Sequence, residues 1–158
     1  MASTRWLTDD EQQAWRAYIA MQQTLSRHLH QHLQRDFDLS DSDFEILVNL
    51  SEADGARLRP VDLAAATQWE KSRLSHHLSR MAARGLVARE PGEGRYPVVV
   101  LTDAGRAALE ACAPANAARV RELFIDVIGP ERLEVLRGIA EDVVAAVETH
   151  RGTDCSLA

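Results

Sequence analysis

The sequence has few cysteines and no long apolar segment, and these absences exclude several classes of protein. Cys112 and Cys155 are its only cysteines, and they form no Cys-x-x-Cys pair, which argues against a disulfide framework and a thiolate zinc site. No apolar run approaches the roughly 20 residues of a membrane-spanning helix. The first residues lack the apolar core of a secretion signal. We therefore expect a single-domain cytoplasmic protein without membrane attachment.

Motifs of the common enzyme classes are also missing. The sequence has no Gly-rich phosphate loop, no nucleophile elbow and no metalloprotease pair. Glu93 and Asp103 flank a predicted strand, but nothing marks them as a catalytic pair. We expect no enzymatic activity, no cofactor and no bound metal.

Positive charge is scarce overall but concentrated in the middle of the chain. The net charge is -6, yet residues 57–106 hold nine Lys and Arg against five acidic residues, a local charge of +4. An acidic frame around a basic module is typical of a DNA-binding protein with separate assembly helices. Chance clustering of surface charge is the alternative.

The spacing of apolar residues predicts four helices in the first half of the chain. Residues 8–36 form a long amphipathic helix with a capping box at Thr8, and Ser40 caps a second helix. Pro60 opens a short third helix after an extended piece at residues 57–59. A fourth helix follows a turn near Thr67, runs from about residue 70 to residue 84, and ends at Gly85.

In the second half of the chain, the spacing of the apolar residues first changes from that of a helix to that of β-strands. Residues 86–89 and 96–101 form two strands around a Gly-rich turn, which indicates a β-hairpin. An Ala-rich helix follows over residues 104–128, in which Pro114 is expected to cause a kink or a local break. A sixth helix begins near Glu131, and its apolar residues are spaced for packing on another helix: Leu133, Leu136, Ala140, Val143 and Val147. We expect a disordered tail over residues 152–158.

Two helices joined by a tight turn and followed by a hairpin are the parts of a winged helix-turn-helix. The predicted fold is thus mostly α with a small β-hairpin wing, in which residues 40–103 form the DNA-binding module and helices flank it at both ends. Leu74, Leu78 and Met81 are expected to anchor the fourth helix. Its outer face then carries short polar and cationic side chains suited to DNA: Lys71, Ser72, Arg73, Ser75, His76, Ser79 and Arg80.

Contacts with the DNA backbone and the minor groove are predicted at three arginines, Arg80 among them. Arg80 and Arg84 lie later in the helix and suit phosphate contacts better than base contacts. Arg95, near the tip of the hairpin, is suited to the minor groove, with Glu93 placed to hold its guanidinium. The alternative is that these residues are solvated faces of an ordinary small α/β module.

From about Val61 to Arg106 the sequence resembles the MarR family of transcription regulators. The resemblance is carried by residues 81–89, which are similar to the family's turn into the wing, and by residues 99–105, which are similar to its exit. The family usually has Asp-x-Arg in the wing, and the triplet here is Glu93-Gly94-Arg95. The resemblance implies DNA contacts at Lys71, Ser72, Arg73, Ser75 and His76, with Arg95 as the wing contact.

The resemblance implies a homodimer held by the first, fifth and sixth helices, residues 8–36 and 104–150. Two-fold symmetry would place the recognition helices about 34–36 Å apart and predict a pseudo-palindromic operator on double-stranded DNA. The resemblance also implies that the protein represses transcription and that a small effector, commonly aromatic, relieves the repression. In the family this effector binds between the dimer helices and the winged module. The candidate lining residues are Trp15, Tyr18, His28 and His32, whose spacing suits core or dimer packing equally well.

Three other functions remain open at this point. His28 and His32 share a helical face on which two imidazoles can reach one metal ion, which would suit a metal sensor. A redox sensor needs an accessible, activated cysteine, and Cys112 and Cys155 are the candidates. A winged-helix module that binds protein would not need Lys71, Arg73 and Arg95 on one surface.

Overall fold

The computed structural model describes residues 5–92 and 96–154, with side chains as far as residue 151. The chain divides into two compact units, residues 1–116 and residues 117–158. None of the helices within these described ranges is long and apolar enough to cross a membrane.

The first two helices begin at the capping boxes that the sequence predicts. α1 (Asp9–Phe37) is capped by Thr8, and α2 (Asp41–Glu52) is capped by Ser40. α1 ends where Asp38 takes a left-handed conformation, with φ 53°. This sharp end turns the chain directly into the cap of α2.

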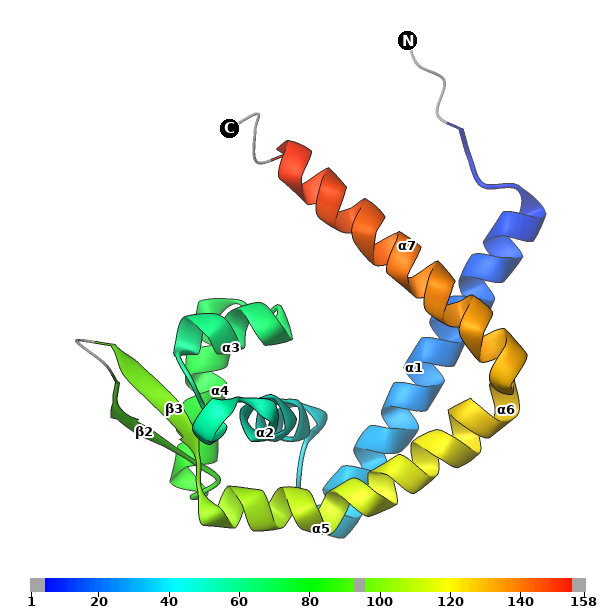
Figure 1. Ribbon diagram of the computed structural model, residues 1–158. Helices are drawn as coiled ribbons and strands as arrows, with labels where there is room; N and C mark the ends of the chain where they lie inside the picture. The colour runs from blue at the N-terminus through cyan, green and yellow to red at the C-terminus, as the bar shows by residue number, and fades with distance from the viewer. Residues whose placement is uncertain (1–4, 93–95, 155–158) are drawn as a thin grey trace. The chain divides into compact units, whose positions relative to one another are not determined.

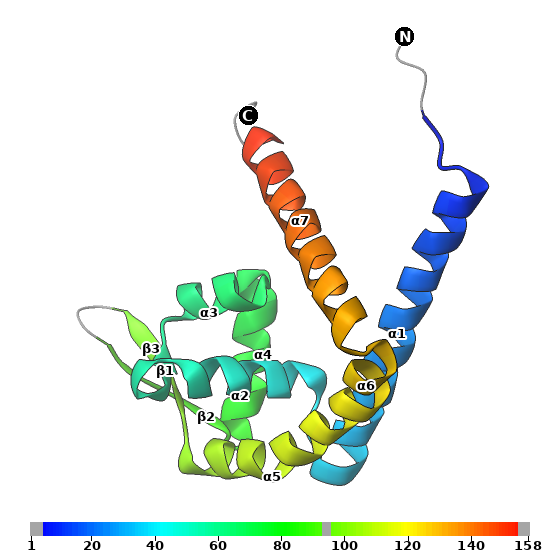
Figure 2. The same ribbon diagram turned by 45° about the vertical axis from the view of Figure 1, so that its right-hand side comes forward.

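The next two helices form the predicted helix-turn-helix. α3 (Pro60–Thr67) starts at Pro60 and is ended by Gln68, which takes a left-handed conformation, and α4 (Lys71–Ala83) begins after a turn of three residues, 68–70. Gly85 has φ 75°, a conformation that glycine adopts without strain, and it turns the chain into the sheet. α3 and α4 lie close together in both ribbon views (Figure 1, Figure 2).

The wing is a sheet of three strands, one more than the predicted hairpin. β2 (Val87–Pro91) and β3 (Pro97–Leu101) pair antiparallel, from Val87 opposite Leu101 to Pro91 opposite Pro97. β1 (Arg57–Leu58), which follows the short 3-10 turn η1 (Asp54–Ala56), pairs with the other edge of β3. The extended piece before α3 is therefore a strand that ties the wing to the helices.

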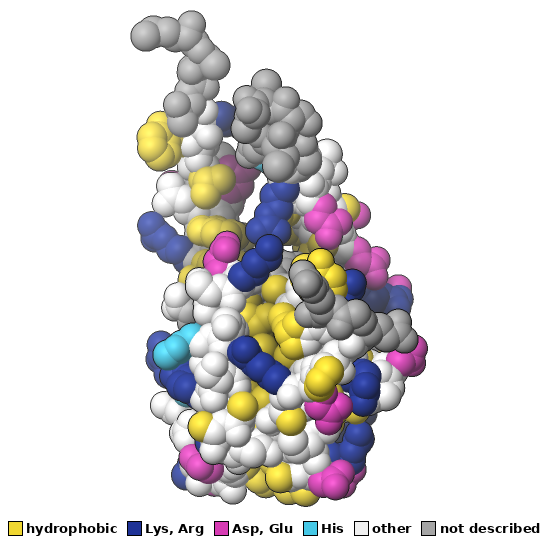
Figure 3. All heavy atoms as spheres, turned by 90° about the vertical axis from the view of Figure 1, so that its left-hand side faces the viewer, with side chains coloured by type: hydrophobic (Ala, Val, Ile, Leu, Met, Phe, Trp, Pro, Cys, Tyr) yellow, Lys and Arg dark blue, Asp and Glu magenta, His cyan; other side chains and the backbone are white. Residues whose placement is uncertain are grey.

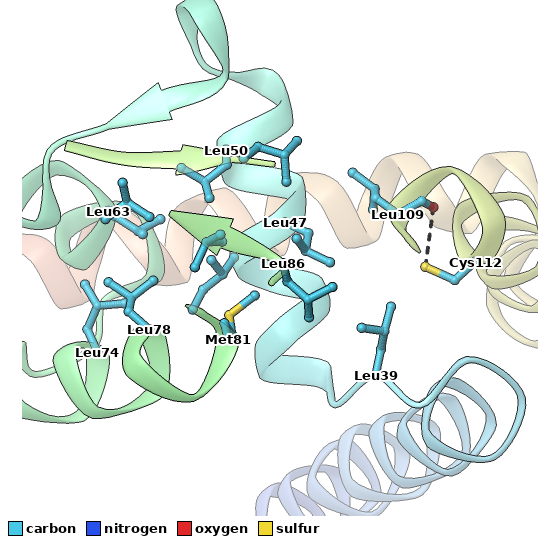
Figure 4. Packing of buried hydrophobic residues seen from close by; sticks show 14 of the residues in the cluster. Leu39, Leu47, Leu50, Leu63, Leu74, Leu78, Met81, Leu86, Leu109 and Cys112 are labelled. Carbon is cyan, nitrogen blue, oxygen red and sulfur yellow. Dashed lines mark hydrogen bonds between the residues drawn. The ribbon is translucent and has the colours of Figure 1, made fainter. Parts of the chain in front are cut away.

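One apolar core joins the sheet to the helices around it. Buried side chains from α2, α3, α4 and the strands converge, and Leu39 and residues of α5 extend the cluster (Figure 4). The most completely buried members are Leu33, Leu39, Ile46, Leu47, Leu50, Leu63, Leu74, Leu78, Met81, Val99 and Cys112. The predicted anchors of the fourth helix are confirmed by this packing.

Thr102 connects the sheet to α5 (Asp103–Val120). Its hydroxyl donates to the carbonyl oxygens of Gly85 and Leu86, at 2.6 and 2.9 Å, and accepts from the N–H of Gly105 at 3.0 Å. A Cβ on Gly105 would lie 2.0 Å from the oxygen of Leu86, so only glycine fits there. This junction explains physically why Thr and Gly stand at these two positions.

The helix that follows the wing is irregular, but at a different position from the predicted one. α5 continues through Pro114, and the change to π-helical bonding comes later, in η2 (Arg121–Ile125), which leads into α6 (Asp126–Ile128). The expected local break at Pro114 is therefore wrong. A proline removes one N–H bond and crowds the carbonyl four residues earlier, but the flanking turns of this Ala-rich helix continue around it.

Gly129 ends α6, and the last helix, α7 (Pro130–Asp154), begins at Pro130 as the Gly-Pro pair predicts. α7 continues through Gly152 to Asp154, so the expected start of a disordered tail at Gly152 is wrong. A helix already formed for more than five turns continues through one glycine at a cost of about 1 kcal/mol. Residues 155–158 lie outside the described residues.

Candidate nucleic-acid interface

α4 has one buried face and one exposed face, as the sequence predicts. Leu74, Leu78 and Met81 are each at most 2% exposed. The opposite face holds the predicted DNA-contacting residues, all of them exposed: Lys71, Ser72, Arg73, Ser75, His76 and Arg80. Glu70, at the N-cap, makes no side-chain capping bond, so its carboxylate does not occupy the N–H groups of the first turn.

Arg73 is held by an aromatic ring that the sequence reasoning missed. Its guanidinium carbon lies 4.0 Å from the centroid of the Trp69 ring, a cation–π contact. Trp69 stands in the turn between α3 and α4 and packs edge-on against His77, with ring centroids 5.5 Å apart. The stack limits where the Arg73 guanidinium can lie on the exposed face of α4.

His77 is a polar residue on the buried face of α4. It is only 8% exposed, and its Nε2 lies 2.9 Å from Oδ1 of Asp43, which is 3% exposed. Its other ring nitrogen, Nδ1, lies 2.7 Å from Nη2 of Arg80. The signal was present in the sequence, because His77 falls three residues after Leu74 and four before Met81, on the apolar stripe.

Asp43 combines a helix-capping role with contacts to α4. Its carboxylate accepts from the backbone N–H of Ser40 at 2.9 Å and from Nη1 of Arg84 at 2.7 Å. Burial raises the pKa of Asp43, but the hydrogen bonds from Ser40 and Arg84 outweigh this and hold the pKa below its ordinary value. Asp43 is therefore a buried carboxylate anion that fastens the end of α4 to the start of α2.

Arg84 differs from its predicted role as a phosphate contact. Besides Asp43, it donates from Nη2 to the carbonyl oxygen of Asp38, and Oδ2 of Asp38 lies 3.6 Å away. A guanidinium committed to two acidic partners of its own chain is poorly placed for DNA. The structure assigns Arg84 to holding the α1–α2 turn against α4.

Two other arginines of the basic segment are paired with acids. Arg59 makes a two-pronged contact with Asp62, at 2.6 and 2.9 Å, and Arg57 lies 3.5 Å from Glu90. These pairs reduce the excess positive charge around the wing. Among the described residues, no such salt bridge reduces the positive charge of Lys71 and Arg73 on the exposed face of α4.

The tip of the wing, with Glu93 and Arg95, lies outside the described residues. The last described pair before it is Gly92 and Tyr96, whose backbone N–H and carbonyl are 3.1 Å apart. A Cβ on Gly92 would lie 2.4 Å from the oxygen of Tyr96, so this closing pair requires glycine. The minor-groove contact of Arg95 stays a prediction.

A hollow of about 630 Å³ lies between α3, α4 and the wing. Figure 3 shows exposed hydrophobic side chains on this face of the molecule, with Lys and Arg side chains near them. The lining is apolar with three cations at its border, and the residues are Arg59, Pro60, Val61, Lys71, Leu74, Ser75, Leu78, Arg89, Tyr96 and Pro97. A small molecule fits this volume, and Lys71 and Ser75 belong to both the hollow and the exposed face of α4.

The residues expected to line an effector site lie apart from this hollow, on α1. The rings of Trp15 and Tyr18 are in contact, 5.6 Å between centroids, and both are exposed. His28 is exposed, whereas His32 is buried, with Nδ1 2.7 Å from Oδ2 of Asp36. These contacts of His32 stay within its own helix.

Cys112 lacks the features of a redox sensor. Its side chain is fully buried, and burial raises the pKa of its thiol, so that the reactive thiolate is disfavoured. Cys155 lies outside the described residues. Within the described ranges, no three His, Cys, Asp or Glu side chains are grouped so as to hold a metal ion.

The helix-turn-helix, the three-stranded wing and the polar, cationic face of α4 define a winged helix-turn-helix protein. A sequence model of the MarR family matches residues 37–95. The crystal structure of AbsC, a MarR family transcriptional regulator from Streptomyces coelicolor, is 43% identical, with a TM-score of 0.89 over 92% of this chain and 99% of that chain. The chain belongs to the MarR family of transcription regulators, and the resemblance in its sequence is confirmed.

Two further structures place this fold on DNA in other proteins. Sco3205, a MarR family transcriptional regulator from S. coelicolor solved in complex with DNA, is 36% identical, with a TM-score of 0.86 over 92% of each chain. A mutant of MarR from E. coli, complexed with operator DNA, shares the fold at 22% identity, with a TM-score of 0.76 over 88% of this chain and 99% of that chain. No match was found among proteins of curated function. Members of this family are transcription regulators and not enzymes, as the sequence predicts.

Proposed function

We propose that this protein is a repressor that binds a pseudo-palindromic operator as a homodimer. It would act in the cytoplasm, where that DNA lies. The observation that carries the proposal is the exposed face of α4, on which Lys71, Arg73 and His76 stand opposite a fully buried apolar face. Arg and Lys can pair with guanine in the major groove, and Ser72 and Ser75 can donate to several base acceptors. Sco3205, similar in sequence and fold, was solved with DNA.

The homodimer is supported by apolar side chains that the single chain leaves in water. On α7, Val135, Ile139, Val143, Val144 and Val147 are each more than half exposed. On α1 and before it, Trp6, Leu7 and Trp15 are more than half exposed as well. Such stripes are typical of helices that pack against a second copy.

The dimer is tested by light scattering on the purified protein. Changing Val143 to Glu places a charge in the apolar stripe and should shift the mass toward that of one chain. A parent protein that is monomeric at micromolar concentration would contradict this part of the proposal.

Regulation by a small molecule is supported by the hollow beside α4. Pro60, Leu74 and Tyr96 offer apolar contact, and Lys71 and Arg89 offer positive charge, which together suit a small aromatic anion. Because Lys71 and Ser75 also face outward for DNA, a ligand in this hollow would compete with the operator. Benzoate is a simple probe, and it should weaken operator binding by the parent and have less effect on an Arg89→Ala variant.

The DNA-binding proposal is tested by retention of genomic fragments, including the region upstream of the protein's own gene, across a salt series. Specific retention of a fragment with an inverted repeat, falling linearly with salt on logarithmic axes, is expected. Failure to retain any DNA at low salt would contradict the proposal and favour a winged-helix module that binds protein.

A further inference from the structure

His77 makes one hydrogen bond through each of its ring nitrogens, and its two partners determine which nitrogen carries the proton. Asp43 is a carboxylate that can only accept, and Arg80 is a guanidinium that can only donate. The ring must therefore donate from Nε2 to Asp43 and accept at Nδ1 from Arg80. This is the neutral tautomer with its proton on Nε2.

We propose that neutral His77 is a positioning residue that holds Arg80 ready for a DNA phosphate, and so raises operator affinity without touching DNA. The inference rests on the proposed function, in which Arg80 contacts the DNA backbone. The neighbouring recognition cation, Arg73, is held through the same cluster, because Trp69 lies between Arg73 and His77.

The cluster is rigid enough to orient a flexible side chain. His77 is fixed by Asp43, and Asp43 is fixed in turn by Ser40 and Arg84. A free arginine side chain samples many rotamers, and part of this conformational entropy is lost when it binds a phosphate. Holding Arg80 beforehand reduces that loss and strengthens binding.

The bond to Arg80 depends on the charge of His77. Burial lowers the pKa of His77 below its ordinary value of 6.5; the facing Asp43 of α2 opposes this, and Arg80 and Arg73 of α4 add to the lowering. Arg84 reaches the same carboxylate from the end of α4. Protonation would turn Nδ1 into a donor facing a guanidinium, so the hold on Arg80 is lost as pH falls through the pKa of His77.

Two substitutions separate the two hydrogen bonds. In His77→Asn the amide oxygen takes the place of Nδ1 and can still accept from Arg80, but the bond to Asp43 is lost. In His77→Gln the amide nitrogen takes the place of Nε2 and can still donate to Asp43, but nothing accepts from Arg80. A merely structural role would make operator affinity follow thermal stability in both variants.

The experiment measures operator affinity by fluorescence anisotropy at pH 7.5, with thermal unfolding of each variant by circular dichroism. We expect His77→Gln to lose roughly three- to ten-fold in affinity, and His77→Asn to lose less while being the less stable. In an Arg80→Ala background, His77→Gln should have no further effect. Equal losses in both backgrounds, or parental affinity of His77→Gln, would overturn the proposal.

Two further measurements, the pH dependence of affinity and an NMR experiment on the parent, test the proposal even if a His77 variant does not fold. As pH falls through the pKa of His77, the parent should lose the part of its affinity that depends on the hold on Arg80, and His77→Asn should lack this part of the pH dependence. Ring nitrogen shifts of the free parent by NMR should show a proton on Nε2 alone at pH 7.5; a proton on Nδ1 would overturn the assignment. A parent that binds no DNA would refute the proposed function, while these shifts would still report the tautomer.

Discussion

Arg84, just after α4, donates a hydrogen bond of 2.7 Å to the carboxylate of Asp43, which lies in the first turn of α2. The two residues are 41 positions apart, and the carboxylate is buried while the guanidinium remains partly exposed. The same carboxylate caps α2 and accepts from His77. One carboxylate of α2 therefore holds α4 at two points, in addition to the apolar packing of Leu74, Leu78 and Met81.

Replacing Asp43 with Asn should destabilise the protein by about 2–3 kcal/mol, because bonds to a charged acceptor are lost and Arg84 loses its buried partner. Urea unfolding followed by circular dichroism measures the change. Asp41→Asn is the matched control, since Asp41 lies on the same turn and is exposed, and its effect should be under about 1 kcal/mol. Equal effects of the two substitutions would contradict the role given to Asp43.

Acid should destabilise the parent more than the Asp43→Asn variant. The pKa of Asp43 is lower in the folded protein than in the unfolded chain, so its contribution is present above the unfolded value of about 3.9 and is lost as pH falls through the folded value. Free energies of unfolding measured between pH 6 and pH 3 should differ by a constant amount above about pH 5 and approach each other below about pH 4. A difference that stays constant over this range would show that the charge of Asp43 is not the cause.

Gly105→Ala should destabilise the protein by more than about 2 kcal/mol, because the added Cβ would overlap the carbonyl oxygen of Leu86. Gly138→Ala provides the same chemical change in α7, where nothing lies within 4 Å of the added Cβ. There the substitution should be neutral or stabilising by up to about 1 kcal/mol. Thermal unfolding of both variants checks the contrast, and similar losses at both positions would contradict it.

Substitutions of Arg73 and Arg95 should affect DNA binding differently. Arg73→Ala removes a contact to one base, so preference at that position should relax by about 1–3 kcal/mol. Arg95→Ala should weaken binding to all sequences and reduce the slope of affinity against salt by about one unit. Binding to a set of single-base operator variants at several salt concentrations distinguishes the two. Parental binding by both variants would mean that the DNA-contacting surface lies elsewhere.

The starts of the first three helices and the end of α4 were predictable because local chemistry sets them. Thr8 and Ser40 begin helices through capping boxes, Pro60 suits a first helical turn, and Gly85 allows the positive φ that ends the recognition helix. Each of these signals acts within a few residues. The apolar spacing of α4 was sufficient for the same reason to predict its buried face.

Features that depend on distant partners were not predictable. The pairing of Asp43 with His77 and Arg84 joins segments more than 30 positions apart, and the pairing of β1 with β3 depends on the folded position of the wing. Helical spacing alone shows that His77 faces inward. Its bond to a carboxylate, and the resulting hold on Arg80, appear only in the structure.

The most direct test of the central claim uses Lys71, the only lysine in the sequence, which stands at the start of the exposed face of α4. Acetylation of its amine, followed by mass spectrometry of peptides, reports contact at one defined position of that face. The account predicts that a specifically retained operator fragment slows acetylation of Lys71 severalfold more than an equal amount of unrelated DNA does. Unchanged acetylation of Lys71 in a complex that remains bound would show that this protein contacts DNA through another surface.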